Sequence, residues 1–529
     1  MNNRKLQVWL PALFALVMVA GMYLGYRLRE NTNTAGSFFR MEKKSPLQEV
    51  LDLVRLKYVD PINTDTLGDD AIREMLMHLD PHSVFIPASD LKNTNADLMG
   101  NFDGIGVEFQ VFSDTVNVMN VLKGGPSDKA GLQAGDKLIS ADGKPLTKPN
   151  IQSEDIRVLL RGPRDSKVVL GIIRGGKEIK ATVTRGRIPL PALDAAYMIE
   201  PGTGFIRISK FSETTYEEFM QSLEKLQALG MKQLILDLRG NGGGLLNEAI
   251  DMADEFLDDN KLIVYTEGNK VPRQDYRARR MGLFEKGDLV LLMDESSASA
   301  SEVLAGALQD WDRATIVGRR SFGKGLVQEQ YQLGDGSALR ITVARYYTPL
   351  GRSIQKPYDK GVKIYQEEVS ERFHNGEVLR TDTAYAVNGK IYNTKSGKKL
   401  YGGGGITPDV VVPIDTSLYA PVLSELYVKG TISNFVYNYY LTNKKELDAL
   451  KGPSDLTGYL NNKALLPLLV DFAKKDSIRV PSLNAVQQNE LELRTRNLLA
   501  RQIWRSEGYF ELSNATDPVV QQALKTLHQ

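Results

Sequence analysis

Hydroxyl and methyl side chains alternate at residues 297–301, where the sequence reads SASAS before an apolar run with helical spacing. One side-chain oxygen is enough to cap the start of a helix, so a simple cap does not account for three closely spaced serines. The excess indicates a hydroxyl that is displayed for nucleophilic chemistry in a crowded place. Such an alcohol reacts only when a neighbouring base accepts its proton.

The candidate base is a lysine. The chain has no cysteine, which excludes a thiolate nucleophile, a disulfide framework and a Cys-ligated zinc site. Histidine, the usual base in such hydrolases, occurs only at positions 78, 82, 374 and 528. Lys324 lies between Gly323 and Gly325, which permit close approach of the backbone. To act as a base, its pKa must fall from about 10.4 toward 7 or 8, which disfavours the charge by about 4 kcal/mol and which burial can supply.

A glycine loop at residues 240–244 reads GNGGG and separates a predicted buried strand from a predicted helix. Residues 288–294 predict another buried strand, which runs into the serine cluster. Strands that alternate with helices between residues 188 and 413 indicate a mostly parallel sheet, whose carboxyl-end loops are the usual place for chemistry. Both loops lie at strand ends of this kind. The glycine loop lacks the Gly-Lys-Ser/Thr ending of a phosphate-binding loop.

Short alternating apolar stretches between residues 104 and 185, separated by Gly, Pro and Asp turns, predict a β domain. This segment resembles a PDZ domain. The resemblance implies that backbone N–H groups of one turn bind the C-terminal carboxylate of a peptide, which adds as a strand to the sheet edge. The residues of that turn are Gly104, Ile105, Gly106 and Val107. The alternative is a glycine turn with no binding role.

Four motifs extend the resemblance to the C-terminal processing peptidases, also called tail-specific proteases. They follow the PDZ-like segment in this order: DLRGNGGGLL, SSASASEVLAGALQD, GRRSFGKGLVQ and RYYTPLGRSIQ. The chain is similar to this family from about Leu47 to Pro413, and the helical segment after Pro413 is outside the common pattern. The resemblance implies a multidomain α/β protein with a crotonase/ClpP-like peptidase core that needs no metal, ATP or other cofactor.

The same resemblance assigns roles to five residues. It implies that Ser299 is the nucleophile, that Lys324 is the general base, and that Gln328 orients the lysine amine. It also implies an oxyanion hole formed by the backbone N–H groups of Ala300 and Gly243. The expected reaction is acyl transfer, in which the serine attacks a peptide carbonyl and water later releases the acyl-enzyme.

The serine cluster can then be interpreted residue by residue. We expect Ser297 to cap the helix, and Ala298 and Ala300 to keep the nucleophile accessible. The first-turn N–H groups of the helix would face the developing negative charge. Gly244 is the second choice for the glycine-loop donor. Considered without the lysine and the glycine loop, Ser299 would be read as a helix cap only.

An apolar run from Val8 to Tyr26 follows Arg4 and Lys5 and is about 28 Å long as a helix, enough to cross a membrane. It has no clear small-x-small cleavage site, so an uncleaved signal anchor is favoured over a removed signal peptide. We therefore expect a single-pass protein of the cytoplasmic membrane. Its catalytic part is expected outside the cytoplasm, in the periplasm if the cell has an outer membrane.

The expected organisation has five parts, with helical segments on both sides of the β domain and the core. These are a cytoplasmic tail and transmembrane anchor at 1–30, a helical segment at 37–100, a PDZ domain at 101–186, a serine peptidase core at 187–415 and a C-terminal helical segment at 416–529. A polar linker is expected around residues 30–36. The C-terminal helices are a candidate surface for assembly into a homo-oligomer.

The amino-acid composition limits the classes of molecule that this protein is expected to bind. Lys and Arg total 66 against 65 Asp and Glu, so the net charge of +1 supplies no general field for nucleic acid. His78 and His82 have metal-ligand spacing, but Pro81 interrupts the helix between them and no third ligand is near, so no metal site is expected. The expected partners are proteins or peptides with free apolar C-termini, and the membrane.

Arg161, near the edge of the PDZ-like segment, is a candidate relay between the two domains because its charge could pair differently when a peptide docks. A solvated surface arginine is the alternative. Two other functions compete with the protease: a catalytically inert PDZ adaptor held at the membrane, and a crotonase-like acyl-CoA enzyme. The second does not explain the PDZ-like segment or the pairing of a serine with a lysine.

Overall fold

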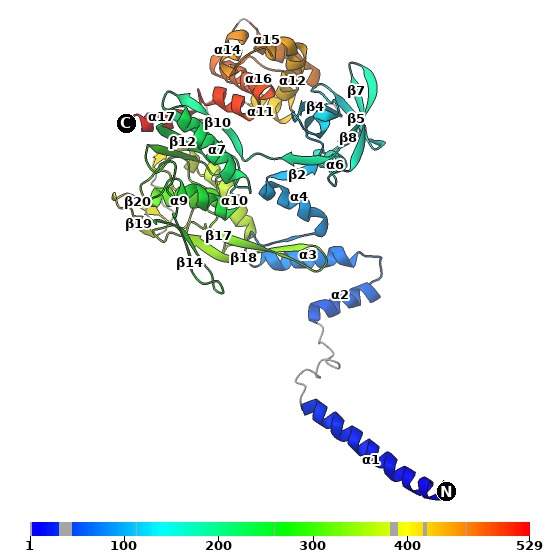
Figure 1. Cartoon of the computed structure of the whole chain (residues 1–529). Coiled ribbons are helices and arrows are strands. Elements are labelled where there is room, and N and C mark those ends of the chain that lie inside the picture. Colours follow the sequence, from blue (N-terminus) through cyan, green and yellow to red (C-terminus); the bar gives the residue numbers. More distant parts are fainter. Residues whose placement is uncertain are drawn as a thin grey trace. The chain divides into compact units, whose positions relative to one another are not determined.

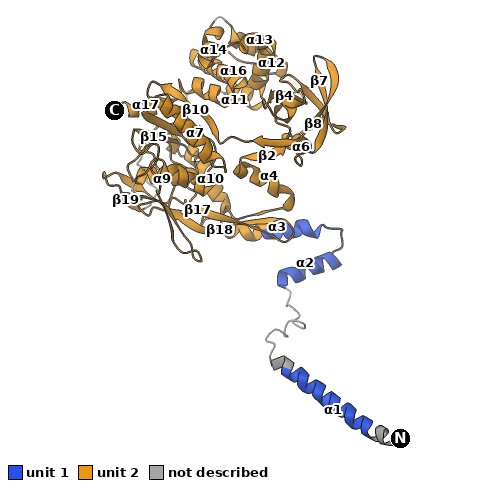
Figure 2. Cartoon of the chain, in the orientation of Figure 1, with its two compact units in different colours: residues 1–72 blue, residues 73–529 orange. Residues whose placement is uncertain are grey.

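A computed structural model describes residues 3–30, 45–112, 114–258, 260–380, 390–415, 421–461 and 463–529. Residues 1–2, nearly all of the linker expected at 30–36 and the expected start of the C-terminal segment at 416–420 lie outside the described residues. The chain divides into two compact units, residues 1–72 and residues 73–529 (Figure 2).

The first unit contains the predicted apolar helix. Helix α1 (Asn3–Glu30) has an apolar stretch from Trp9 to Arg27 with a mean hydropathy of 1.6, and none of that stretch is buried (Figure 1). This length and composition fit a membrane anchor, and they fit a signal sequence equally well. Helix α2 (Pro46–Lys57) begins after Ser45, whose hydroxyl accepts the N–H of Gln48, and α3 (Thr64–Met77) follows it.

The predicted α/β core, in the second unit, is built on a six-stranded sheet. Its strands, in spatial order, are β10 (Leu193–Glu200), β11 (Thr203–Ile208), β12 (Gln233–Asp237), β15 (Leu289–Met293), β16 (Thr315–Gly318) and β21 (Val410–Val411). Only the β10–β11 pair is antiparallel, and the four other neighbouring pairs are parallel. The expected parallel α/β core is confirmed.

Alternate side chains of the central strands enter two different apolar clusters, which explains why these strands are apolar throughout. On β12, Leu234 and Leu236 join the cluster that includes side chains of α7 (Thr215–Ala228), α8 (Leu246–Asp254) and α9 (Ala300–Asp310). Ile235, between them, packs in the second cluster with α17 (Pro518–Leu527). Helices therefore cover both faces of the sheet (Figure 1).

A second sheet carries the lysine motif. It contains β1 (Val84–Ile86), β13 (Leu262–Glu267), β14 (Gln274–Arg277), β17 (Leu326–Gln332) and β18 (Ala338–Tyr347). Strand β18 is the longest, and it pairs with β17, β1 and β13. Lys324 precedes β17, and Gln328 lies on β17 opposite Thr342 of β18.

The PDZ-like segment forms a separate sheet with its own apolar core. Its strands are β3 (Val107–Phe112), β4 (Thr115–Val121), β5 (Lys137–Ala141), β6 (Lys144–Pro145), β7 (Lys167–Arg174) and β8 (Lys177–Thr184), with helices α5 (Pro126–Lys129) and α6 (Ser153–Leu160). Strand β3 is at one edge of this sheet. The antiparallel pair β2 (Asn101–Gly104) and β9 (Gly186–Pro189) leads into and out of it.

Helices and one short hairpin make up the rest of the second unit. Helix α4 (Ala88–Met99) precedes β2, and α10 (Val362–His374) and a short 3₁₀ helix at Glu377–Leu379 follow β18. The strands β19 (Ile391–Asn393) and β20 (Lys399–Tyr401) form a hairpin. The C-terminal helices are α11 (Pro421–Val428), α12 (Thr431–Thr442), α13 (Lys444–Leu447), α14 (Pro453–Leu460), α15 (Leu465–Ala473), a 3₁₀ helix at Lys474–Asp476 and α16 (Ala485–Ser513). They share an apolar core, as the amphipathic patterns predict.

Candidate active site

The serine cluster follows β15 and leads into α9, next to the glycine loop that follows β12. The two strands are parallel neighbours, so their carboxyl ends bring both loops to the same edge of the sheet. The hydroxyl of Ser297 donates to the carbonyl of Leu238 at 2.8 Å, and that of Ser301 donates to the carbonyl of Asn241 at 2.9 Å. These two serines attach the nucleophile segment to the neighbouring loop, which leaves the middle serine for the cleft.

The expectation that Ser297 caps the helix is wrong. Helix α9 begins at Ala300, and the residue at its N-cap position is Ser299. Ser297 is fully buried and binds the end of β12 instead, because the chain makes a further turn before the helix. Ser299 has φ 54° and ψ −114°, a conformation that a residue with a side chain seldom adopts and that is typical of functional sites.

The glycine loop contacts the nucleophile segment so closely that a side chain does not fit. A Cβ atom on Gly243, where φ is +96°, would lie 2.7 Å from the Cβ of Ser299 and 3.0 Å from the nitrogen of Ala300. The N–H of Gly243 donates to Oδ1 of Asn241 at 2.9 Å. Gly243 is thus beside the predicted oxyanion position, but its N–H has a protein acceptor in this conformation and must leave it to bind an oxyanion.

The other predicted donor groups are at the same place. Ala300 is the first residue of α9, where N–H groups have no acceptor within the helix. At Gly244, φ is +145°, and a Cβ atom there would lie 2.0 Å from the carbonyl oxygen of Phe211. The loop therefore requires glycine at both positions.

Lys324 enters the site from the second sheet. Its Nζ donates to Oε1 of Gln328 at 3.2 Å. Burial lowers the pKa of Lys324, and the positive charge of Arg340 on β18 lowers it further. This is the direction that a general base requires, because only the neutral amine has a lone pair to accept a proton.

All five residues of the predicted catalytic centre line one cleft of about 370 Å³. Its walls are formed by Leu98 of α4, residues 242–246, Ser299, Ala300, Lys324, residues 326–328, Arg340 and Tyr346. The cleft thus joins a hydroxyl, a lysine of lowered pKa and a helix N-terminus in a partly enclosed volume. Such an arrangement can carry out nucleophilic acyl transfer.

Two further residues of the site were not predicted from the sequence. The fully buried carboxylate of Glu302 accepts the N–H of Ser299 and the N–H of Lys324, both at 2.8 Å, through Oε2. Its Oε1 accepts the N–H of Gly323 and the hydroxyl of Ser321. Burial raises the pKa of Glu302, an effect that these hydrogen bonds oppose. One side chain therefore joins the nucleophile segment to the lysine segment.

Tyr346 makes the second link between these segments. Its hydroxyl lies within hydrogen-bonding distance of the carbonyl oxygens of Ser299 and Lys324. The sequence offered one signal for this pair of residues: Glu302 comes three positions after Ser299, where a carboxylate can reach back to the N-cap N–H. For Tyr346 on β18 no local pattern indicates the contact.

The predicted PDZ residues lie away from this cleft. Gly104 ends β2, Val107 begins β3, and the intervening carbonyls of Ile105 and Gly106 accept the N–H groups of Ser127 and Leu122. Because β3 is an edge strand of its sheet, the turn stands at the end where an added peptide strand would terminate.

Arg161 follows α6 and contacts two elements outside the PDZ-like sheet. Its guanidinium carbon lies 4.4 Å from the ring centroid of Phe102 on β2, and its Nη1 donates to Oδ1 of Asn93 on α4 at 3.1 Å. Helix α4 also contributes Leu98 to the cleft. Arg161 is thus attached to a helix that reaches the catalytic centre.

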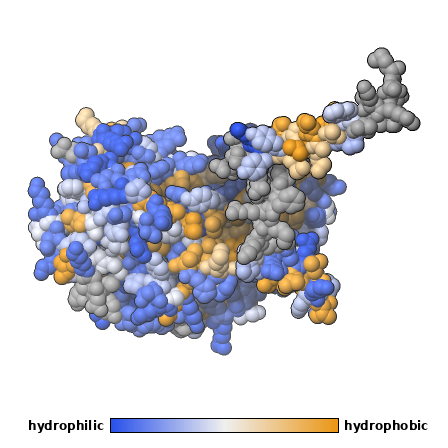
Figure 3. Space-filling model, turned by 90° about the horizontal axis from the view of Figure 1, so that it is seen from below, coloured by the Kyte–Doolittle hydropathy of each residue, from blue (hydrophilic) through white to orange (hydrophobic). Residues whose placement is uncertain are grey.

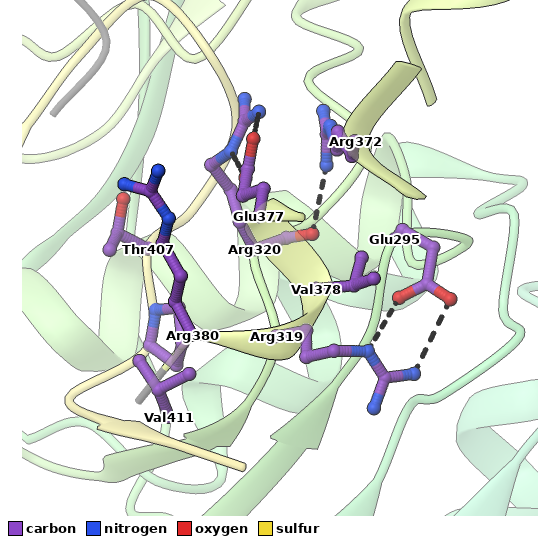
Figure 4. Close-up of a pocket in the computed structure, with 10 residues that line it drawn as sticks. Glu295, Arg319, Arg320, Arg372, Glu377, Val378, Arg380, Thr407 and Val411 are labelled. Atoms are coloured by element: carbon purple, nitrogen blue, oxygen red, sulfur yellow. Dashed lines mark hydrogen bonds and ion pairs between the residues drawn. The ribbon is translucent and has the colours of Figure 1, made fainter. Parts of the chain in front are cut away.

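Another cavity is lined by Arg319 and Arg320, which precede Lys324 in the sequence, and by residues of other elements (Figure 4). The charged groups on its walls include the pair of Arg319 with Glu295 and the pair of Arg320 with Glu377. Arg372 donates to the carbonyl of Arg320 and supports the same segment. This cavity contains no predicted site residue. Across the described ranges, no group of three or more His, Asp or Glu side chains is arranged to hold a metal ion.

The surface shown in Figure 3 is mainly hydrophilic, with apolar residues in scattered patches. Several ionisable side chains outside the cleft form ion pairs, such as Arg239 with Asp237 and Asp517. The cleft combines a half-buried lysine of lowered pKa with a serine of unusual backbone conformation.

Comparison with known proteins gives three matches along the chain. Residues 202–364 match peptidase family S41, residues 104–184 match the PDZ domain, and residues 422–505 match a family of unknown function. A carboxy-terminal-processing protease of Bartonella bacilliformis is 35% identical over 405 residues, which cover 74% of this chain and 91% of the relative.

A carboxyl-terminal-processing protease of Synechocystis sp. is 35% identical over 397 residues, covering 70% of this chain and 89% of the relative. The solved structure of the photosystem II D1 C-terminal processing protease aligns with 29% identity over 69% of this chain and 86% of that chain, with a TM-score of 0.36.

Proposed function

Because this chain belongs to the carboxy-terminal processing proteases, serine-type peptidases of family S41 with a PDZ domain, we propose that it is a membrane-anchored endopeptidase with a Ser299/Lys324 dyad. The observation that carries the proposal is the convergence of Ser299, Lys324, Gln328 and the glycine loop on one cleft. Its PDZ domain is proposed to recognise free apolar C-termini of protein substrates.

In the proposed reaction, the neutral amine of Lys324 accepts the proton of the Ser299 hydroxyl as its oxygen attacks the peptide carbonyl. The tetrahedral oxyanion is stabilised by the N–H of Ala300, by the N-terminus of α9 and by a glycine-loop N–H. The protonated lysine then gives its proton to the leaving amine, and an acyl-enzyme remains. Water attacks the ester, again with Lys324 as base, and releases the new C-terminus.

The glycine-loop donor requires a local change before the oxyanion forms. The N–H of Gly243 must turn from Asn241 toward the cleft, or the N–H of Gly244 must serve in its place. Positive φ at both glycines makes such a peptide rotation accessible, since no Cβ opposes it.

The proposed location follows from helix α1. An uncleaved anchor at residues 1–30 would hold the rest of the chain on the outer side of the cytoplasmic membrane. That part comprises the helical segment at 37–100, the PDZ domain at 101–186, the core at 187–415 and the C-terminal segment at 416–529. Fractionation of cells that produce the full chain with a C-terminal tag tests this. The tag should stay with membranes and be digested by protease added from the outer side. Assembly through the C-terminal helices stays a prediction.

The direct test of the function uses two unfolded substrates that differ only at the C-terminus. Residues 45–529 should cleave a substrate with an apolar tail faster than one with a charged tail, because only the first fits the PDZ domain. Cleavage products are measured by mass spectrometry. If neither substrate is cleaved while the tail still binds, the inert adaptor becomes the better account.

Arg340 is predicted to set the working pH of the enzyme. The substitution Arg340→Gln removes a positive charge that lowers the pKa of Lys324, so that pKa should rise. Since the neutral amine is the active form, the acylation rate should reach half its maximum at a higher pH than in the wild type. The measurement is the burst rate against pH. Arg345→Gln, an exposed residue of the same strand, is the control, and an unchanged midpoint in Arg340→Gln would refute the prediction.

Arg161 is proposed to transmit the effect of peptide binding from the PDZ domain to the catalytic centre. The substitution Arg161→Ala removes the contacts with Phe102 and Asn93, so peptide-stimulated cleavage should fall toward the basal rate. Cleavage of a tail-less substrate is measured with and without a separate apolar-tailed peptide. Arg157→Ala, an exposed arginine of α6 that pairs with Glu154 of the same helix, is the control. If Arg161→Ala leaves both basal and stimulated cleavage unchanged, the relay is rejected.

A further inference from the structure

We propose that the turn formed by Asp80, Pro81, His82 and Ser83 is a positioning element of the active site, which orients the Gln328 amide and keeps the lone pair of Lys324 available to Ser299. This 80–83 turn lies before β1, 246 residues from Gln328 in the sequence. The inference rests on the proposed function, in which Lys324 is the base.

The 80–83 turn is held by its own side chains. Asp80 is buried, and its Oδ1 accepts the N–H groups of His82 at 2.8 Å and Ser83 at 2.9 Å. Its Oδ2 accepts the hydroxyl of Ser83, which in turn accepts the N–H of Thr342 on β18 at 3.1 Å. Pro81 restricts φ between the two ends. The carbonyl of His82 therefore has a fixed direction.

Strand pairing places the turn and Gln328 at the same level on opposite edges of β18. Strand β1 pairs with β18 through Val84 opposite Arg340, and β17 pairs with the other edge of β18 through Gln328 opposite Thr342. The 80–83 turn thus contacts Thr342 at one edge of β18, and the Gln328 side chain reaches the turn from the other edge. The Nε2 group of Gln328 donates to the carbonyl oxygen of His82, and its Oε1 accepts the amine of Lys324 at 3.2 Å.

The direction of the Gln328 amide decides what its oxygen and nitrogen can do for the lysine. A backbone carbonyl only accepts hydrogen bonds, so the amide nitrogen must face His82 and the amide oxygen must face Lys324. In the reversed orientation the amide N–H would point at the neutral amine and would occupy its single lone pair. That lone pair must accept the proton of Ser299. By holding the Gln328 amide in the observed orientation, the turn leaves the lone pair of Lys324 free.

The ring of His82 fixes the turn to a third element. Its Nε2 lies 2.7 Å from the hydroxyl of Tyr365 on α10, and the Tyr365 ring meets Phe322 edge-on at 5.8 Å. Burial, together with the nearby charge of Lys324, lowers the pKa of His82 to about 4. The ring is therefore neutral near pH 7 and adds no positive charge beside the base.

A double-mutant cycle tests whether the turn acts through Gln328. Asp80→Ala is expected to lower kcat by roughly 10- to 100-fold, because the base is misplaced, while KM stays within about twofold. In a Gln328→Ala background the same substitution should lower kcat by less than about threefold, since the group it positions is already absent. The cycle is measured on the full chain in detergent with an apolar-tailed substrate, at the pH of maximal rate, where loss of the Asp80 charge, which raises the pKa of Lys324, does not enter. Equal factors in the two backgrounds, or no effect in the first, would overturn the proposal.

Two controls separate this outcome from other failures. Asp90→Ala, an exposed acidic residue of the neighbouring helix α4, should leave kcat unchanged. Ser83→Ala removes the hydroxyl that joins Asp80 Oδ2 to the N–H of Thr342 but keeps both N–H bonds to Asp80 Oδ1, so it should show the same coupling to Gln328 if Asp80→Ala does not fold. Failure of the proposed function appears instead as wild-type cleavage by Ser299→Ala. If Ser299→Ala is inactive but the effects of Asp80→Ala and Gln328→Ala are additive, the further inference is refuted and the proposed function is not.

Discussion

The substitutions Ser299→Ala and Lys324→Met are each expected to reduce the acylation rate by about 10⁴-fold or more. The first removes the oxygen that attacks the peptide, and the second removes the amine that accepts its proton. Methionine keeps the length and apolar stem of lysine, so the cleft should stay packed. The rate is followed by mass spectrometry of the acyl-enzyme and by product release from an apolar-tailed substrate.

Two comparisons make this prediction specific. Lys324→Arg keeps a positive charge that cannot be removed at working pH, so it should be as inactive as Lys324→Met. Lys363→Ala, an exposed lysine on α10, should behave as the wild type. Retention of cleavage within tenfold of wild type in Lys324→Met would show that another group deprotonates Ser299, and the dyad would have to be abandoned.

Replacing Glu302 is expected to have the next largest effect, although this side chain takes no part in the chemistry. Its carboxylate accepts the N–H groups of Ser299 and Lys324 and so fixes the distance between nucleophile and base. In Glu302→Gln, one side-chain oxygen becomes an NH₂ group that faces donors. We expect a loss of roughly 10²-fold in kcat from the displaced segments.

The same substitution should lower the free energy of unfolding by about 1–3 kcal/mol for each buried N–H that loses its acceptor. Urea unfolding and steady-state kinetics measure the two effects on one preparation. Glu371→Gln, an exposed glutamate of α10, is the matched control. If Glu302→Gln is folded and fully active, the carboxylate does not position the dyad.

The sequence predicted the layers of the core because the buried positions of its strands carry apolar residues. Residues 234–236 and 289–293 are apolar on both faces, and the structure shows both faces covered. The meeting of the glycine loop with the serine cluster followed from parallel pairing. Motif resemblance supplied the roles of Ser299, Lys324 and Gln328, and the structure adds that they share one cleft.

What the sequence did not predict depends on contacts between distant residues. The hydroxyl of Ser297 was expected at a helix cap, but its acceptor is Leu238, 59 positions earlier. The contact of the 80–83 turn with the site was not predicted, because nothing local shows that the carbonyl of His82 faces Gln328. The bond between Gly243 and Asn241 likewise depends on the path of the loop rather than on its glycine content.

The most direct test of the account is the titration of the Lys324 amine. Lysine side chains labelled with ¹³C are followed by NMR from pH 5 to 11, and the Lys324 resonance is assigned by its absence in Lys324→Met. The account predicts that this amine loses its proton at a pH clearly below that of the other lysines, and that acylation of Ser299 rises with the same midpoint. An amine that titrates with the exposed lysines, while acylation is already maximal at lower pH, would contradict it.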